Sequence, residues 1–102
     1  MTLFPMFMKL EGRSCLVVGA GTVGEPKINS LVRAGASVRV VALHATAAVA
    51  EWAQAGAITW EARAFNSADL DGTFLVIAAT NSSDVNAAIF HQARQRNAFH
   101  PQ

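Results

Sequence analysis

One short stretch, residues 14–27, restricts the possible fold of this chain more than any other. Residues 15–18 read C-L-V-V, an apolar run typical of a strand that is buried on both faces. Gly19, Gly21 and Gly24 follow at G-x-G-x-x-G spacing. The first glycine permits a tight turn, the second lets backbone approach a pyrophosphate, and the third lets helix and strand pack closely. The stretch therefore predicts a strand that turns directly into a helix, with an anion site at the helix N-terminus.

The residues that follow extend this motif into a unit of about 30 residues, the length expected of strand, helix and strand. A helix is predicted over residues 23–34, since Pro26 falls in the first turn, where proline is tolerated, and Gly35 supplies a stop. Residues 37–42, S-V-R-V-V-A, give the second strand. A glycine turn that merely joins strand to helix remains the alternative to a phosphate site. The predicted apolar stripe of the helix consists of Val23, Ile28, Leu31 and Val32.

Alternating strand and helix patterns continue to the end of the chain. Thr46 is a candidate N-cap, and Ser82 or Ser83 is another. The pattern predicts one α/β domain over residues 1–102, a Rossmann-like parallel sheet of strand order 3-2-1-4 that is truncated before the later strands. The further predicted elements are a helix over 46–55, a strand over 58–61, a polar turn with one helical turn over 66–72, a strand over 74–79, and a helix over 84–96 whose apolar face is Val85, Ala88, Ile89 and Ala93.

Candidate ligand contacts lie where the predicted strands end. An acidic residue that would hold the adenosine ribose of NAD is missing after the second strand, where the chain reads Ala42-Leu43-His44. Ribose contacts would then come from backbone groups, His44 or Thr46, and the choice between NAD and NADP stays open. His44 is interpreted as a loop histidine rather than a catalytic base. Thr80 and Asn81 end the strand over 74–79 and would border a ligand in the crevice, while Lys27 lies either near the anion site or in solvent.

Composition excludes several classes of function. The chain has 102 residues and a net charge of +1, so charge gives no indication of a nucleic-acid partner. Its single cysteine, Cys15, is expected to be a buried, inert thiol, and no metal-ligand spacing or paired nucleophile and base is found. No stretch is long enough to span a membrane, so a cytoplasmic protein is expected. The apolar content, 52% of residues, favours self-association into a homo-oligomer.

The sequence resembles the NAD-binding domain of the siroheme synthase N-terminal family, the precorrin-2 dehydrogenases that also act in some members as sirohydrochlorin ferrochelatases. The resemblance covers nearly the whole chain. The matching segments are L-F-P-M-F near the N-terminus, C-L-V-V-G-A-G-T-V-G-E-P-K, R-A-G-A-S-V-R-V-V-A, F-L-V-I-A-A-T-N, and D-V-N at Asp84 to Asn86.

This resemblance implies NAD as cofactor and the tetrapyrrole precorrin-2 as substrate, oxidised to sirohydrochlorin. By match, the dinucleotide phosphates would contact the glycine loop, the adenosine end would face Leu43 and His44, and the nicotinamide side would be bordered by Thr80 and Asn81. The loop residues concerned are Gly19, Gly21, Thr22, Val23 and Gly24.

The chain departs from the family pattern at three places. Where the family has a basic pair, Glu25-Pro26-Lys27 leaves Lys27 as the one positive charge for a polycarboxylate substrate. Asn81 replaces an aspartate, and the later strand whose aspartate is thought to serve in dehydrogenation is not in this chain, so no catalytic residue is assigned. Two alternatives therefore stay open: a dinucleotide-binding sensor without chemistry, and an inactive fragment of a longer enzyme.

Overall fold

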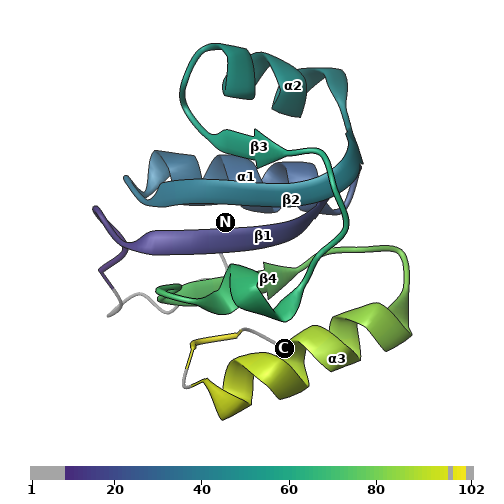
Figure 1. Ribbon diagram of the computed structural model, residues 1–102. Helices are drawn as coiled ribbons and strands as arrows, with labels where there is room; N and C mark the ends of the chain where they lie inside the picture. The colour runs from purple at the N-terminus through teal and green to yellow at the C-terminus, as the bar shows by residue number, and fades with distance from the viewer. Residues whose placement is uncertain (1–8, 97, 101–102) are drawn as a thin grey trace.

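A parallel sheet of strand order β3-β2-β1-β4 forms the centre of the computed structural model, which describes residues 9–96 and 98–100 (Figure 1). The fold is the predicted Rossmann-like α/β arrangement, and the predicted strand order is confirmed. The strands are β1 (Ser14–Ala20), β2 (Ser37–Ala45), β3 (Thr59–Glu61) and β4 (Leu75–Ala78). The helices are α1 (Gly24–Arg33), α2 (Ala47–Gln54), the 3-10 helix η1 (Ser67–Leu70) and α3 (Ser83–Gln95).

Strand β1 is the central element, because it pairs with β2 on one side and with β4 on the other. Leu16 and Val17 have no exposed surface, although their side chains point to opposite faces of the sheet. Both faces must therefore be covered, which explains the continuous apolar run in the sequence. Truncation of Leu16 to alanine would cost about 2–5 kcal/mol, the usual range for a buried leucine.

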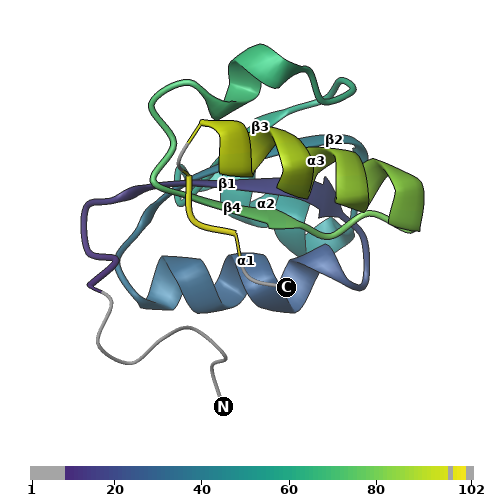
Figure 2. The same ribbon diagram turned by 90° about the horizontal axis from the view of Figure 1, so that it is seen from below.

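The two faces of the sheet are covered by different elements (Figure 2). On one face, Ile28 and Leu31 of α1 and Val49 of α2 pack against Val17 and Val40. On the other face, α3 and η1 cover β1 and β4. The buried side chains of this second layer are Leu16, Val18, Val41, Leu70, Val76, Ile89, Ala93 and Ala98.

Side-chain caps set the start of most helices, as the sequence indicates. The Thr46 hydroxyl accepts a hydrogen bond from Val49 N at 3.3 Å, and the Ser82 hydroxyl accepts one from Val85 N at 3.2 Å. The predicted N-cap at Thr46 is confirmed, and Ser82 rather than Ser83 caps α3. Each cap satisfies a backbone N–H that the helix itself cannot pair.

Several local predictions are wrong. Strand β2 continues to Ala45, so His44 lies in a strand rather than in a loop, because Ala45 still pairs with Ala20 of β1. Val85 is 42% exposed and is not part of the buried face of α3, which Ile89 and Ala93 form. Three differences are smaller. Val23 is the N-cap of α1 and not part of its buried stripe, and Ala88 is exposed and not part of the buried face of α3. Ile58 is buried but precedes β3, which begins at Thr59.

A single parallel bridge between Leu75 and Phe99 follows α3 on the outer side of β4. Phe99 N donates to Phe74 O at 3.0 Å, and Val76 N donates to Phe99 O at 2.8 Å. Residues 97–102 are too few and too polar to predict another long strand, and residues 98–100, the part of this segment that the structure describes, form only this bridge. The sequence also predicts an extended segment over residues 1–10; residues 1–8 of it lie outside the described residues, and residues 9 and 10 belong to no helix or strand.

Candidate functional site at the carboxyl ends of the strands

The ends of β1, β2 and β4 meet at one edge of the sheet, since all the strands run in the same direction (Figure 1). Ala79 N donates to Val18 O at 2.8 Å, and Thr46 N donates to Ala20 O at 3.0 Å. These bonds hold the segments that follow β4 and β2 against the end of β1. In open α/β sheets a ligand binds at this edge, where the connections after two neighbouring strands, here α1 after β1 and α3 after β4, lead to opposite faces of the sheet.

Each glycine of the motif has a different structural environment. Gly19 has a φ of +112°, and a Cβ there would lie 2.4 Å from Ala79 O. A Cβ on Gly24 would lie 2.2 Å from Gly19 O, so helix α1 packs directly on the end of β1. Gly21 is different, because a Cβ there would meet no protein atom within 4 Å. The first and third glycines serve the fold, and the space beside the second remains open to a ligand.

Helix α1 begins without the side-chain cap that the other helices have. Its N-cap is Val23, whose side chain cannot accept a hydrogen bond. Among the helices of the described residues, α2, α3 and η1 are each capped by a Thr, Ser or Asn side chain. In this first turn Glu25 N donates to Gly21 O at 2.9 Å and Pro26 has no N–H. The capacity to bind an anion therefore rests on the N–H of Gly24 and those of the loop residues before it, with the positive end of the helix dipole behind them.

Three exposed apolar side chains belong to segments that begin or end at this edge. Val23, Leu43 and Val85 are 46%, 63% and 42% exposed. They belong to the N-cap of α1, the end of β2 and the first turn of α3. Exposed apolar side chains gathered beside open backbone donors are typical of a small-molecule site. Val23 and Leu43 were predicted as ligand contacts, but Val85 was not, because the helical spacing of Val85 is that of a core residue.

The turn after β4 is held by one side chain from α3. Asn86 Oδ1 accepts hydrogen bonds from Thr80 N at 3.2 Å and from Thr80 Oγ1 at 2.6 Å, while Asn86 Nδ2 donates to Thr80 O at 3.1 Å. Ser82 N donates to Thr80 Oγ1 at 3.2 Å. Thr80 is half-buried, and Asn81 is exposed. Asn86 is the last residue of the D-V-N segment that matches the family, and no role was predicted for it from the sequence.

The remaining predicted site residues occupy the same edge or its vicinity. Thr22 is exposed in the glycine loop, and His44 is exposed near the end of β2. Lys27 is half-buried in the first turns of α1. The structure thus places every predicted contact on the glycine loop, α1, the end of β2 or the turn after β4.

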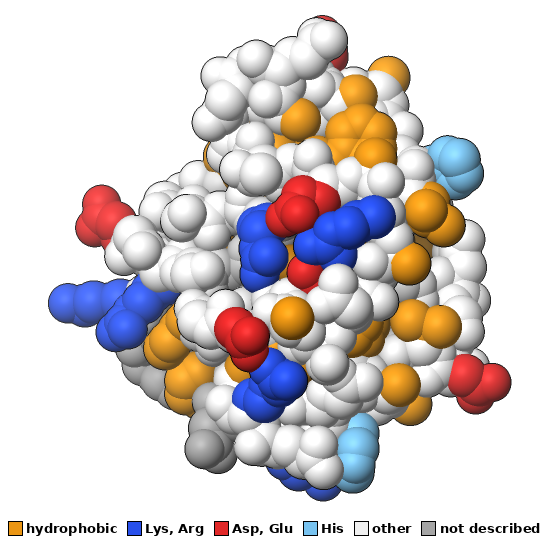
Figure 3. All heavy atoms as spheres, viewed as in Figure 1, with side chains coloured by type: hydrophobic (Ala, Val, Ile, Leu, Met, Phe, Trp, Pro, Cys, Tyr) orange, Lys and Arg blue, Asp and Glu red, His pale blue; other side chains and the backbone are white. Residues whose placement is uncertain are grey.

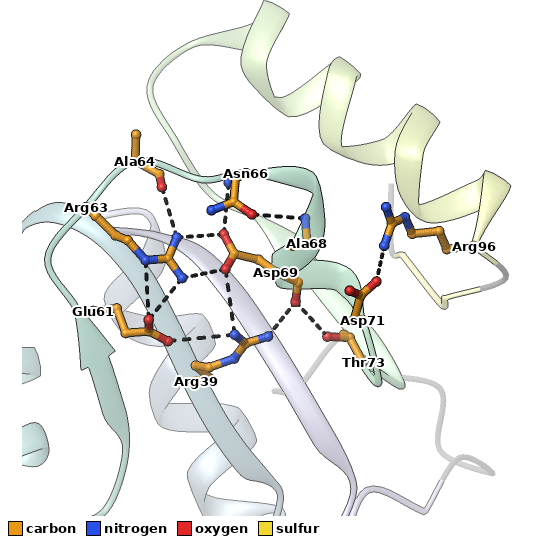
Figure 4. Close-up of polar contacts among 10 residues, drawn as sticks. All are labelled: Arg39, Glu61, Arg63, Ala64, Asn66, Ala68, Asp69, Asp71, Thr73 and Arg96. Carbon is orange, nitrogen blue, oxygen red and sulfur yellow. Dashed lines mark hydrogen bonds and ion pairs between the residues drawn. The ribbon is translucent and has the colours of Figure 1, made fainter.

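A separate charged cluster lies over β2 and β3 on the face of the sheet that α3 partly covers (Figure 3). Its centre is the buried carboxylate of Asp69, which accepts two hydrogen bonds from Arg63, at 2.5 and 2.9 Å (Figure 4). Asn66 N donates to the same carboxylate at 2.9 Å. Arg39 donates to the backbone O of Asp69 and lies 3.7 Å from Glu61.

This cluster anchors η1 to the sheet rather than forming part of the edge site. Its donors and acceptors satisfy one another, as a buried carboxylate requires. Hydrogen bonds from Arg63 hold the pKa of Asp69 below its ordinary value. The cluster was not predicted from the sequence, although N-S-A-D at residues 66–69 has the form of a capping box that indicates the start of η1.

The described residues contain no group of three His, Cys, Asp or Glu side chains that could hold a metal ion. Burial raises the pKa of the Cys15 thiol to about 11, so this residue is not a thiolate nucleophile at neutral pH. Within the described residues no helix is long and apolar enough to cross a membrane.

The fold, the glycine loop and the uncapped helix define a nucleotide-binding domain of the Rossmann type. The chain belongs to the family described as "Putative NAD(P)-binding", whose model matches residues 6–100. The cofactor class is therefore a nicotinamide dinucleotide.

The curated relatives include siroheme synthases. Siroheme synthase 1 of Pectobacterium atrosepticum is 46% identical over 97 residues, which are 95% of this chain and 20% of that protein. Siroheme synthase 1 of Yersinia enterocolitica is 47% identical over 97 residues, 95% of this chain and 21% of that protein. The resemblance stated from the sequence is confirmed. The chain spans about a fifth of the length of these relatives.

Solved structures give the same result for the fold. SirC, a precorrin-2 dehydrogenase, superposes with a TM-score of 0.81 at 27% identity, over 98% of this chain and 49% of that one. D-lactate dehydrogenase from Escherichia coli superposes with a TM-score of 0.67 at 12% identity, over 91% of this chain and 29% of that one. The second likeness concerns the fold alone.

Proposed function

We propose that this chain is the NAD-binding domain of a precorrin-2 dehydrogenase, acting in the NAD-dependent oxidation of precorrin-2 to sirohydrochlorin. The observation that carries the proposal is the open space at Gly21 beside the uncapped N-terminus of α1. A Cβ at position 21 would fill the space that a pyrophosphate needs, so the residues present fit the cofactor. The resemblance to siroheme synthases and to SirC supports the choice of reaction.

The residues divide the proposed site into two halves on either side of β1. Backbone N–H groups of Thr22, Val23 and Gly24 bind the pyrophosphate. The adenosine half lies toward Leu43 and His44 at the end of β2, and the nicotinamide half lies toward Thr80 and Asn81 after β4. A bound NAD would supply the hydride acceptor for the oxidation, and the protein would supply the orientation and surroundings of that step.

We propose NAD rather than NADP as the cofactor. A 2′-phosphate is ordinarily held by an arginine near the end of the second strand. Residues 42–50 read A-L-H-A-T-A-A-V-A and contain neither arginine nor lysine. A 2′-phosphate bound there would therefore lose hydration without forming an ion pair with an arginine or lysine of this segment.

Lys27 is the proposed contact for a carboxylate of the tetrapyrrole substrate. It lies in α1, one turn beyond the proposed phosphate site, and is half-buried. The proposal assigns no general acid or base. Asp69 is the buried carboxylate of the described residues, and both of its oxygens accept hydrogen bonds from Arg63.

The lack of an assigned general acid or base among the described residues favours a second candidate, a sensor that binds the dinucleotide without catalysing a reaction. The two functions share the binding site and differ in turnover. NAD reduction measured with precorrin-2 present separates them, because turnover excludes the sensor and binding without turnover supports it.

The primary test is calorimetric titration of the 102-residue chain with NAD and, separately, with NADP. We expect NAD to bind, NADP to bind at least tenfold more weakly, and Gly21→Val to abolish NAD binding while leaving the circular dichroism spectrum unchanged. Equal affinity of Gly21→Val and the unsubstituted chain for NAD would show that the loop is only a structural turn.

We also propose that the chain associates with itself. Light scattering of the same samples tests this proposal, which a monomer across the micromolar range would exclude.

A further inference from the structure

The side-chain amide of Asn86 makes three hydrogen bonds to a single residue, Thr80, six positions earlier in the chain. It accepts from the backbone N–H and the hydroxyl of Thr80 and donates to the backbone carbonyl. The orientation of the amide is fixed by this pattern, because only its oxygen can face an N–H and only its nitrogen can face a carbonyl. One side chain thus determines both backbone groups of the residue that follows Ala79.

These bonds are not needed to start helix α3. The Ser82 hydroxyl already accepts from Val85 N, which is the ordinary cap contact, and Asn86 N donates to Ser82 O within the helix. Asparagine is also a weaker helix former than alanine, so local propensity does not favour it at this position. The Asn86 amide therefore acts on the turn outside the helix.

The turn that Asn86 holds lies directly beside the glycine loop. Ala79 immediately precedes Thr80, and its carbonyl oxygen is the atom that a Cβ on Gly19 would meet at 2.4 Å. Asn81 and Ser82 are exposed, so neighbouring side chains do not fix this turn by burying it. Ser82 N donates to Thr80 Oγ1 within the turn, but the Asn86 amide is what ties the backbone of Thr80 to α3. Without the amide, the turn would sample more conformations, and a ligand would have to order it on binding.

We propose that Asn86 is a positioning residue for the nicotinamide half of the site: it presets the Thr80 turn and does not contact the ligand. This inference rests on the proposed function, in which the adenosine half lies across β1 at the end of β2. Loss of the amide should then weaken ligands that reach the β4 side and spare ligands that end before it. ADP-ribose, which has the adenosine, pyrophosphate and second ribose of NAD but no nicotinamide, is such a ligand.

The test is calorimetric titration of Asn86→Ala with NAD and with ADP-ribose. We expect NAD affinity to fall about tenfold, equivalent to about 1.4 kcal/mol, and ADP-ribose affinity to change less than about twofold. Asn86→Leu keeps the number and branching of the side-chain heavy atoms without the amide and should give the same selective loss. Gln95→Ala is the matched control, since it removes an exposed amide from the same helix and should change neither affinity.

A merely structural role gives a different result, because loosening of the whole domain would weaken both ligands together. Equal loss of NAD and ADP-ribose, loss of neither, or unfolded circular dichroism spectra for both Asn86 variants would overturn the inference. Failure of the unsubstituted chain to bind either ligand would instead refute the proposed function. The two failures are therefore distinguishable from one set of titrations.

Discussion

Substitution of Gly24 by alanine tests how closely α1 packs on the end of β1. The new Cβ would lie 2.2 Å from Gly19 O and 2.9 Å from Gly19 C, whereas ordinary contact begins at 3.4 Å. Both atoms belong to backbone, so helix and strand would have to separate by about 1 Å. Overpacking of this kind costs about 1–3 kcal/mol, and the better helix propensity of alanine returns about 1 kcal/mol at most.

Because the contact is with backbone, we take the upper end of the overpacking cost. After the gain in helix propensity is subtracted, we expect Gly24→Ala to lower the free energy of unfolding by about 2 kcal/mol. For a domain of this size, such a loss lowers Tm by roughly 8–16 °C. Thermal unfolding followed by circular dichroism measures it directly. Gly21→Ala is the matched control, because its Cβ meets no protein atom within 4 Å. Alanine there should leave stability unchanged or raise it by about 0.4–1 kcal/mol through the unfolded state.

The pair of variants also separates folding from binding. Gly21→Ala should lose NAD affinity while its Tm is preserved, since its methyl group occupies the space assigned to the pyrophosphate. Equal Tm values for Gly24→Ala and Gly21→Ala would refute the packing role of the third glycine. A reversed order, with Gly21→Ala the less stable, would refute the assignment of both glycines.

Three further outcomes follow from side chains away from the glycine loop. Arg63 holds the pKa of Asp69 below its ordinary value, so this carboxylate contributes stability above about pH 4 that is lost as pH falls through the lowered pKa. Urea unfolding between pH 2.5 and 6 should therefore show a pH dependence that Asp69→Asn reduces, and an unchanged profile would contradict the role of the pair. The Cys15 thiol, with a pKa of about 11, should react with Ellman's reagent at pH 8 only as fast as the protein unfolds, and rapid native reaction would contradict its burial. Ser82→Ala should cost about 1 kcal/mol in thermal unfolding, whereas Ser83→Ala should cost less, and equal losses would contradict the assignment of the cap.

The central part of the fold could be predicted from the sequence because its signals are local. The apolar run at residues 15–18 and the glycines after it lie within one strand-turn-helix unit. The parallel order 3-2-1-4 then followed from the alternation of strands and helices and the need for crossover connections. The ends of these strands determine where a ligand would lie, so the region of the candidate site could be predicted as well.

The features that escaped prediction depend on partners distant in the sequence. Ala45 remains in β2 because it pairs with Ala20, and a sequence of A-L-H-A gives no sign of that pairing. Arg39 meets Asp69 only after β2 and β3 are in register and η1 has folded across them. Val85 follows the helical spacing of a core residue, yet it lies in the first turn of α3, where the helix extends to the edge of the sheet.

The position of β1 between β2 and β4 has a consequence for the order of folding. Cys15 pairs with Val38 of β2 across a short segment that α1 bridges, but it pairs with Leu75 of β4 across a much longer one. Closure of the longer loop costs more chain entropy, so we expect the β1-α1-β2 unit to form first and β4 to dock late. Conservative substitutions in β4 such as Val76→Ala should then speed unfolding with little effect on the folding rate, and a slowed folding rate in stopped-flow measurements would contradict this order. The contact between Ala79 and Gly19 would be among the last to form, and the protein would acquire its ligand site only as folding is completed.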